Sequence, residues 1–310
     1  MFFASADRAL ASDGWNSCAT AKRIGLAGLK CGARLLGLIL LGGFLCATLV
    51  RSSPGYGVEE EELDSRLNAE SVKALRDARS SEGSLAGFYV QYWKQMLHGD
   101  LGFSRSLQEP VGQLMRERAP GTFKSVGVGL VLGWALGLPL AIITVMGRST
   151  AVDLGANLLA SVTLCIPAGV MALLCVLWQV PGRLVLALVV FPKVFEYTRN
   201  LLLRSAAMPH VVTARAKGLG PLRILVWHVI PTAASPLLAL GGISISVAFA
   251  AAIPVEVLCD VPGLGQLAWS AALSRDLNLL VLITLLISAL TLLANSVAEM
   301  AGNREVTETA

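Results

Sequence analysis

The chain has 310 residues, of which 55% are hydrophobic and only 15% are charged, and its mean hydropathy is +0.66. A soluble domain carries about a quarter charged residues, so this composition excludes an ordinary soluble globular protein. Apolar runs of about 20 residues indicate instead an all-α integral membrane protein. The net charge of +4 does not indicate nucleic-acid binding, because the cations cluster beside the apolar runs.

The first apolar run, 34–50, follows an N-terminal extension, residues 1–33, in which basic residues outnumber acidic ones. Cations ahead of an apolar run can mark a secretory signal peptide, but no clear small-x-small cleavage site follows this one. We therefore interpret 34–50 as an uncleaved first span, with its N-terminus in the cytoplasm according to the charge bias. Residues 1–33 would then be a cytoplasmic extension, whose function the sequence does not indicate.

Residues 51–122 form a polar segment, which we expect to lie outside the cytoplasm. The acidic run Glu59–Glu62 is more typical of a solvated face than of a cation site. A disordered linker is disfavoured, because the segment contains too many aromatic residues. The pair Gly99 and Asp100 predicts a tight change of direction.

Further apolar runs predict five more spans, which alternate with polar connections. A Gly-Leu-Pro sequence at 137–139 suits a membrane helix, where neighbouring groups can satisfy the carbonyl that proline frees. Residues 123–298 would form the transmembrane part, and residues 299–310 a polar tail. The predicted spans are Phe123–Met146, Leu154–Trp178, Leu184–Leu203, Pro236–Val255 and Leu277–Ala298.

Charged residues interrupt the fourth of these six spans. Lys193 and Glu196 stand three positions apart, so they can pair on one helix face, and Arg199 follows three positions later. Ionisable residues inside a span are by default candidates for a translocation path. A self-neutralising pair on a protein-packed face is the alternative.

A basic segment, Thr213–Pro231, separates the fourth and fifth spans. It cannot lie in hydrocarbon, since each Arg or Lys at the centre of a membrane costs about 2.5–3.5 kcal/mol. Gly218 and Gly220 fit a turn that ends one helix, and Pro221 fits the first position of the next. The sequence therefore predicts a helix–turn–helix within an exposed loop, residues 204–235.

The spacing in this loop resembles the EAA loop of ABC importer permeases, in particular the dipeptide, oligopeptide and nickel branch. The family pattern is Glu-Ala-Ala, three residues, Gly, nine residues and Ile-x-Leu-Pro. The matching positions are Val212-Thr213-Ala214, Gly218 and His228-Val229-Ile230-Pro231. A second family pattern matches Val255-Glu256, Pro262-Gly263-Leu264-Gly265, Leu267 and Arg275-Asp276.

The resemblance implies a type I ABC importer permease fold with six transmembrane helices and an external helical segment between the first two spans. In that segment it implies helices at Ser71–Arg79 and Tyr89–Leu97. The residues that would couple to a separate ATPase are Thr213, Ala214, Arg215, Ala216, Lys217, Gly218, Leu219, His228 and Pro231. Candidates for an outer gate or turn are Glu256, Pro262, Gly263 and Gly265. The outer connection 179–183 is shorter than in the family.

The partners implied by the resemblance are a second homologous permease, two ATPase subunits at the cytoplasmic face, a substrate-binding protein outside and the lipid bilayer. The location is the bacterial inner membrane, with both termini in the cytoplasm. The chain contains no Walker A sequence or local catalytic signature, so we do not expect it to be an enzyme itself. We expect no cofactor, no metal and no nucleic acid.

Two other functions stay open. An ion-coupled secondary transporter or channel would use Lys193 and Glu196 and would need no ATPase, although the internal inverted repeats typical of such proteins are not visible. A membrane-anchored assembly protein would bind its partner through residues 51–122. The solute, whether a peptide, nickel, glutathione or an oligosaccharide, cannot be read from these residues.

Overall fold

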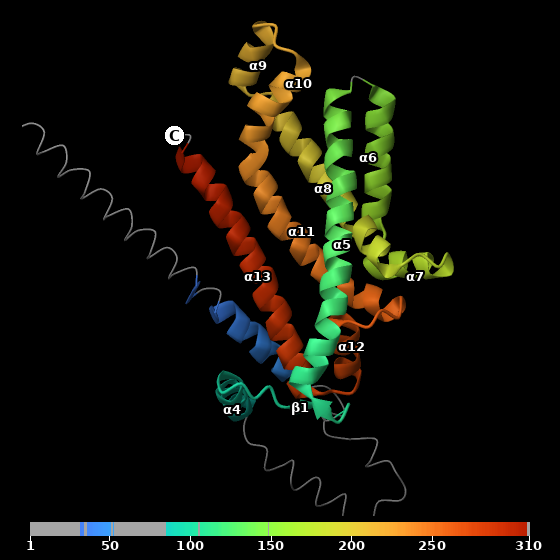
Figure 1. Ribbon diagram of the computed structural model, residues 1–310, viewed down its shortest axis with the longest axis vertical. Helices are drawn as coiled ribbons and strands as arrows, with labels where there is room; N and C mark the ends of the chain where they lie inside the picture. Colours follow the sequence, from blue (N-terminus) through green and yellow to red (C-terminus); the bar gives the residue numbers. More distant parts are fainter. Residues whose placement is uncertain are drawn as a thin grey trace, which may run out of the picture.

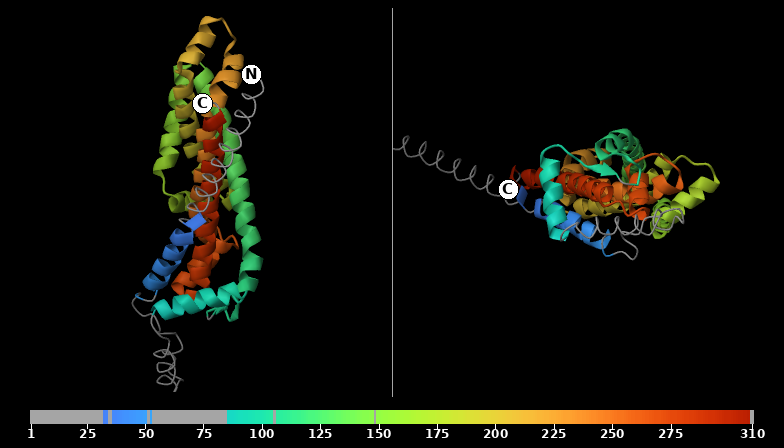
Figure 2. Two further views of the ribbon diagram at one scale, coloured as in Figure 1. Left: turned by 90° about the vertical axis from the view of Figure 1, so that its left-hand side faces the viewer. Right: turned by 90° about the horizontal axis from the view of Figure 1, so that it is seen from below.

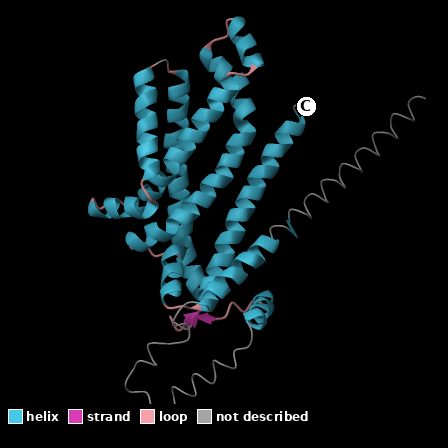
Figure 3. Cartoon of the chain, turned by 180° about the vertical axis from the view of Figure 1, so that it is seen from behind, coloured by secondary structure: helices cyan, strands magenta, loops and turns pink. Residues whose placement is uncertain are grey.

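The computed structural model describes residues 32–33, 36–50, 52, 85–104, 106–147 and 149–308, and nearly all of them are helical (Figure 3). Residues 1–31 of the expected extension, the acidic run and the helix at Ser71–Arg79 lie outside these residues. The elements are a helix at Leu36–Val50, α4 (Leu85–Leu97), β1 (Phe103–Ser104), β2 (Glu109–Pro110), α5 (Val111–Met146), α6 (Thr150–Cys165), α7 (Ala168–Leu177), α8 (Gly182–Ala206), α9 (Pro209–Ala216), α10 (Pro221–Ile224), the π-helix η1 (Leu225–Val229), α11 (Ile230–Leu258), α12 (Leu264–Leu273) and α13 (Leu277–Glu308).

The long helices form an elongated bundle (Figure 1). Helices α9 and α10 project at one end, whereas α4, α12 and the antiparallel β1–β2 hairpin lie at the other. In the view turned by 90° about the vertical axis, α4 runs across the end of the bundle opposite α9 and α10 (Figure 2, left). The two groups of residues expected on opposite sides of a membrane therefore lie at opposite ends of the molecule.

Three described helical stretches are long and apolar enough to cross a membrane, namely Val111–Met146, Pro221–Leu258 and Leu277–Glu299. A fourth is present if α6 and α7 together form one span. The helix Leu36–Val50 is apolar but shorter, and α8 carries the charged residues noted above. The described residues thus contain three clear spans and up to four, and the count of six remains a prediction.

The predicted third span, Leu154–Trp178, contains a sharp bend. Helices α6 and α7 meet at an angle of 100°, and Ile166 and Pro167 lie between them. Proline has no amide hydrogen and disfavours the helical conformation of the residue before it. Ile166 accordingly has extended backbone angles, φ −84° and ψ 119°.

Two other helices are longer than expected. Helix α5 begins at Val111 instead of Phe123 and continues through Pro120 and Pro139, so it includes the end of the expected external segment. Helix α13 continues to Glu308, through most of the polar tail. In both helices the backbone extends the apolar span into polar residues, which hydropathy alone does not mark as helical.

A row of glycines lets α5 and α8 pack closely. Gly129, Gly133 and Gly137 recur every fourth residue on α5, and all three are buried. A Cβ atom added at Gly129 would lie 2.6 Å from the Leu186 Cβ, and one at Gly133 would lie 2.8 Å from the Val190 Cγ1. Small residues at this spacing allow two membrane helices to approach until their backbones nearly touch.

Five helix ends share one hydrogen-bond pattern. After α4, α7, α9, α11 and α12, a residue with positive φ is followed by an amide that donates to the carbonyl five residues earlier, as in the Schellman motif. Two of the positive-φ residues are glycines, and the others carry side chains. The five are Gly99, Gln179, Gly218, Asp260 and Arg275.

Helix α4 is anchored by two tyrosines. The Tyr89 hydroxyl donates to the Leu40 carbonyl at 2.7 Å, and the Tyr92 hydroxyl donates to the Asn278 carbonyl at 3.4 Å. Burial raises the pKa of Tyr92, so its hydroxyl remains a donor throughout the physiological range. The expected aromatic helix Tyr89–Leu97 is therefore present and begins at Leu85, and it is fixed to the helix Leu36–Val50 and to the start of α13.

Candidate functional site: a projecting helix–turn–helix and a capped outer turn

The predicted helix–turn–helix is present in the basic loop. Helix α9 ends at Ala216, and Gly218 has φ +74°, a conformation that glycine adopts without steric cost. The Gly218 amide donates to the Arg215 carbonyl at 2.9 Å. Gly220 then precedes Pro221, the first residue of α10, where a missing amide hydrogen costs nothing.

This helix–turn–helix has a small apolar core of its own. Its buried residues pack with the last turns of α8 and the end of α5, which include Ile142, Val145 and Met146. A polar contact adds to this core, because the His210 Nε2 lies 3.3 Å from the His228 carbonyl oxygen and 3.3 Å from the Thr232 Oγ1. The buried core residues are Leu202, Val211, Ala214, Ile224, Leu225, Val229 and Ala233.

The predicted coupling residues mostly face outward. Ala214 is buried, Leu219 and His228 are half-buried, and the other predicted residues are exposed. Beside them lies an exposed apolar patch, Leu222, Val226 and Trp227, with exposed fractions of 67%, 53% and 73%. Sequence reasoning missed this patch, although large apolar residues four and five positions apart in a basic segment are a detectable signal.

The helix–turn–helix continues into a span without a break. The π-helix η1, Leu225–Val229, joins α10 to α11, and together they form one helical stretch of 38 residues, Pro221–Leu258. Single π turns inside α-helices occur often at functional sites. The helical backbone is therefore continuous from α10 into α11.

At the opposite end, α12 receives its N-terminal cap from other helices. Gly263, the residue before α12, has no side chain to accept from the first-turn amides. Instead the Leu264 amide donates to the Thr122 Oγ1 of α5 at 2.7 Å, and the Gly265 amide donates to the Glu256 Oε2 of α11 at 2.7 Å. A carboxylate at a helix N-terminus also interacts favourably with the helix dipole.

The two glycines of this turn make room for the carboxylate. A Cβ at Gly263 would collide with the Glu256 carboxyl group, and a Cβ at Gly265 would lie 2.7 Å from the Ile253 Cα. Glu256 is 1% exposed, and its Oε1 accepts no hydrogen bond from the residues that the structure describes. The structure thus brings together Glu256, Gly263 and Gly265 around Pro262, where α5, α11 and α12 meet in one joint. A gating role for these residues stays a prediction.

Replacing Glu256 with alanine should destabilise this joint by about 2–3 kcal/mol, since the first-turn amides of α12 would lose a charged acceptor. Glu256→Gln keeps an oxygen acceptor and should cost less. Thermal unfolding of the detergent-solubilised protein measures both effects. Glu117→Ala, at an exposed position of α5, is the matched control. Equal unfolding temperatures for Glu256→Ala and the control would contradict this assignment.

The Arg-Asp match of the second family pattern has a similar structural role. Asp276 is 5% exposed, and its Oδ1 accepts from the Leu279 amide at 3.3 Å, which caps α13. Its Oδ2 accepts from the Ser104 hydroxyl at 2.7 Å and from the Ser106 amide at 3.2 Å. Asp276 therefore fastens the β1–β2 hairpin to the start of α13.

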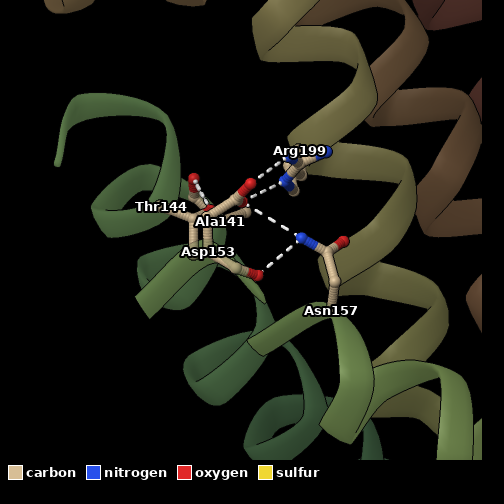
Figure 4. A network of polar contacts seen from close by, with 5 residues as sticks. All are labelled: Ala141, Thr144, Asp153, Asn157 and Arg199. Atoms are coloured by element: carbon tan, nitrogen blue, oxygen red, sulfur yellow. Dashed lines mark hydrogen bonds and ion pairs between the residues drawn. The ribbon is translucent and has the colours of Figure 1, made fainter. Parts of the chain in front are cut away.

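The charged residues of the fourth predicted span do not form one cluster. Lys193 and Glu196 are both half-buried, and in the part of the chain that the structure describes they form no ion pair with each other. Arg199 instead pairs with Asp153 of α6, at 2.7 Å (Figure 4). Their role in a translocation path stays a prediction.

Comparison with known proteins agrees with this architecture. The family model described as "Binding-protein-dependent transport system inner membrane component" matches residues 133–304. A peptide permease protein of Brucella suis biovar 1 is 26% identical over 86% of this chain and 93% of its own length. The oligopeptide transport system permease protein OppB of Escherichia coli K12 is 26% identical over 82% of this chain and 88% of its own.

Two further proteins extend the comparison. The nickel import system permease protein NikB of Staphylococcus aureus is 26% identical over 81% of this chain and 82% of its own length. In the inward-facing MetNI methionine ABC transporter, one chain shares the fold, with a TM-score of 0.51 at 18% identity, covering 65% of this chain and 99% of that one. The resemblance to ABC importer permeases is therefore confirmed, and the chain belongs to the family of binding-protein-dependent transport system inner membrane components.

Proposed function

We propose that this chain forms half of the pore of an ATP-driven importer and takes up peptides or a similar small solute. The observation that carries the proposal is the projecting helix–turn–helix. It has its own apolar core, an exposed apolar patch and exposed basic residues, and it continues into the span α11. Such an element can receive force from another protein and pass it to the membrane helices.

In this mechanism separate ATPase subunits bind the helix–turn–helix and displace it when ATP binds and is hydrolysed. The displacement tilts α11, which packs against α8, α12 and α13. At the far end of α11, Glu256 links the movement to α12, and Thr122 links α12 to α5. The pore would then alternate between inward-open and outward-open states, with nucleotide biasing the two populations.

The proposed topology has six spans, formed by Leu36–Val50, α5, the α6–α7 pair, α8, α11 and α13. Both termini and the helix–turn–helix would lie in the cytoplasm, in agreement with the cations Arg215, Lys217 and Arg223. A second homologous permease would complete the pore, two ATPase subunits would bind below, and a substrate-binding protein would deliver solute outside. The family and the names of the relatives support these partners.

The solute class follows from the relatives, which are named for peptide, oligopeptide and nickel transport. The test is uptake into liposomes that contain the complete complex, with labelled di- to pentapeptides and radioactive Ni²⁺ as separate probes. We expect uptake of peptide that requires ATP on the helix–turn–helix side. Uptake driven by an ion gradient without ATPase subunits would support the secondary-transporter alternative instead.

Replacing Trp227 with alanine should weaken binding of the ATPase subunits by about 2 kcal/mol, because exposed tryptophans at interface centres contribute most to binding. Co-purification of the ATPase with the tagged permease measures the loss. Trp178→Ala is the control, since Trp178 is 77% exposed and follows α7, far along the chain from the helix–turn–helix. Full retention of the ATPase by Trp227→Ala would count against docking at this patch.

A further inference from the structure

Asp153 and Arg199 form an ion pair between α6 and α8, and we propose that this pair transmits movement of the helix–turn–helix to the α6–α7 pair. Arg199 lies in the last two turns of α8, after which the chain enters α9. Asp153 lies in the first turn of α6, directly after the connection from α5. The inference rests on the proposed function, and it assigns a positioning role to Asp153 and Arg199.

The pair is held in a fixed orientation. The Arg199 Nε donates to the Asp153 Oδ1 at 2.8 Å, and its Nη2 donates to the Oδ2 at 2.7 Å, so the guanidinium and carboxylate meet through two parallel bonds (Figure 4). Such bidentate contacts restrict rotation as well as distance. Asn157, one turn further along α6, donates to the same carboxylate at 3.1 Å. The side chains of Arg199 and Asp153 are only 20% and 33% exposed.

Helix α6 has few other attachments near this end. Below the ion pair, Ala156 and Ala160 pack against Phe191 and Phe195 of α8, with Ala141 of α5. On the other side, large apolar side chains are exposed. These are Leu154, Leu158 and Val162. Because α6 packs mainly on α8, it should follow α8 only as long as both the aromatic contact and the ion pair hold.

The far end of the α6–α7 pair reaches the outer part of the molecule. The end of α7 and the following turn line an open pocket of about 480 Å³ together with Gly121 of α5, Gly182 at the start of α8 and Pro262 of the capped turn. Movement of α8 can therefore change this pocket directly and, by way of the α6–α7 pair, on its α7 side as well. The ion pair is the polar link at the beginning of that route.

The pair could also be read as a site that contacts solute, or as a purely structural contact. If Arg199 bound solute, moving the positive charge to position 153 would not preserve its function. If the contact only held the fold together, its loss would reduce the amount of assembled complex without changing how much solute is moved per ATP. A transmitting pair predicts a third result, continued ATP hydrolysis with little transport.

The experiment uses the complete complex in liposomes and measures peptide uptake and ATP hydrolysis in the same preparation, normalised to the amount of assembled complex. Asp153→Asn and Arg199→Gln should lower the number of peptides transported per ATP about tenfold or more, within the range of coupling effects between sites. Asn200→Ala, at an exposed position next to Arg199, is the control and should leave that ratio unchanged. The charge-swapped variant, Asp153→Arg with Arg199→Asp, should restore a substantial part of it.

An unchanged ratio in both single variants would overturn the inference, and so would a swapped variant that assembles but remains as uncoupled as the single ones. These outcomes differ from failure of the proposed function. In that case the unaltered complex would show no ATP-driven uptake of labelled peptide or Ni²⁺, and the transmitting role would fall with it.

Discussion

Gly133→Leu should prevent α5 and α8 from packing and should remove most of the folded protein from the membrane. Even a Cβ at this position would lie 2.8 Å and 2.9 Å from two atoms of Val190 and 3.3 Å from the Phe191 amide nitrogen. Adding methylenes to a packed site costs about 1–3 kcal/mol, and a leucine here meets backbone that cannot move aside, so we expect about 3 kcal/mol or more. The yield of monodisperse protein after detergent extraction measures the effect.

The same helix offers a control for this prediction. Gly127 has no atom within 4 Å of an added Cβ, so Gly127→Leu should be extracted in normal yield. Gly133→Ala should fall between the two, because its single methyl group can be accommodated only if Val190 shifts. Normal yield and unfolding temperature for Gly133→Leu would show that the two helices do not approach as closely as described.

Gly218→Glu should abolish solute uptake while membrane insertion stays intact. With φ +74° this position imposes a conformation that costs an ordinary residue about 1–2 kcal/mol, too little to unfold the protein. Nothing lies within 4 Å of an added Cβ, so the side chain itself would be accommodated in the isolated chain. The loss should arise at the docking surface, where the turn changes its angle and a negative charge joins a basic face.

The effect is measured as ATP-dependent uptake of labelled peptide at equal amounts of inserted permease. Asparagine adopts positive φ more readily than other residues with side chains, so Gly218→Asn should keep most of the uptake. Normal uptake by Gly218→Glu would argue strongly against a coupling role for this turn. Loss of the permease from the membrane would show that the turn is needed for folding.

The features that could be predicted from the sequence are those that depend on residues close together in the chain. The turn at Gly218 and Gly220 and the helix start at Pro221 depend on neighbouring residues only, and all of them are present as predicted. The bend at Pro167 was missed because apolar composition on both sides hides a break in the backbone. The glycines of α5 could have been recognised from their spacing, but not the helix on which they pack.

Contacts between residues far apart in the chain could not be predicted from the sequence alone. The sequence suggested a pair between Lys193 and Glu196 on one helix face, whereas the ion pair that forms joins Arg199 to Asp153, 46 positions away on another helix. Glu256 was recognised from its pattern, whereas its contact with the first turn of α12 and the neighbouring role of Thr122, 142 positions from Leu264, depend on three helices meeting. Such pairings are set by packing, which a single sequence does not specify.

The π turn at Leu225–Val229 has a consequence for how this segment can evolve. A π turn holds one residue more than an α turn but rotates the chain by nearly the same angle, so deleting a single residue there would restore regular α geometry and leave α10 in nearly its present orientation relative to α11. Leu222 would then still point to the same side. The same deletion in the regular part of α11 would instead rotate everything before it by about 100°. The π turn is thus the place where this segment can lose one residue without reorienting the helix–turn–helix.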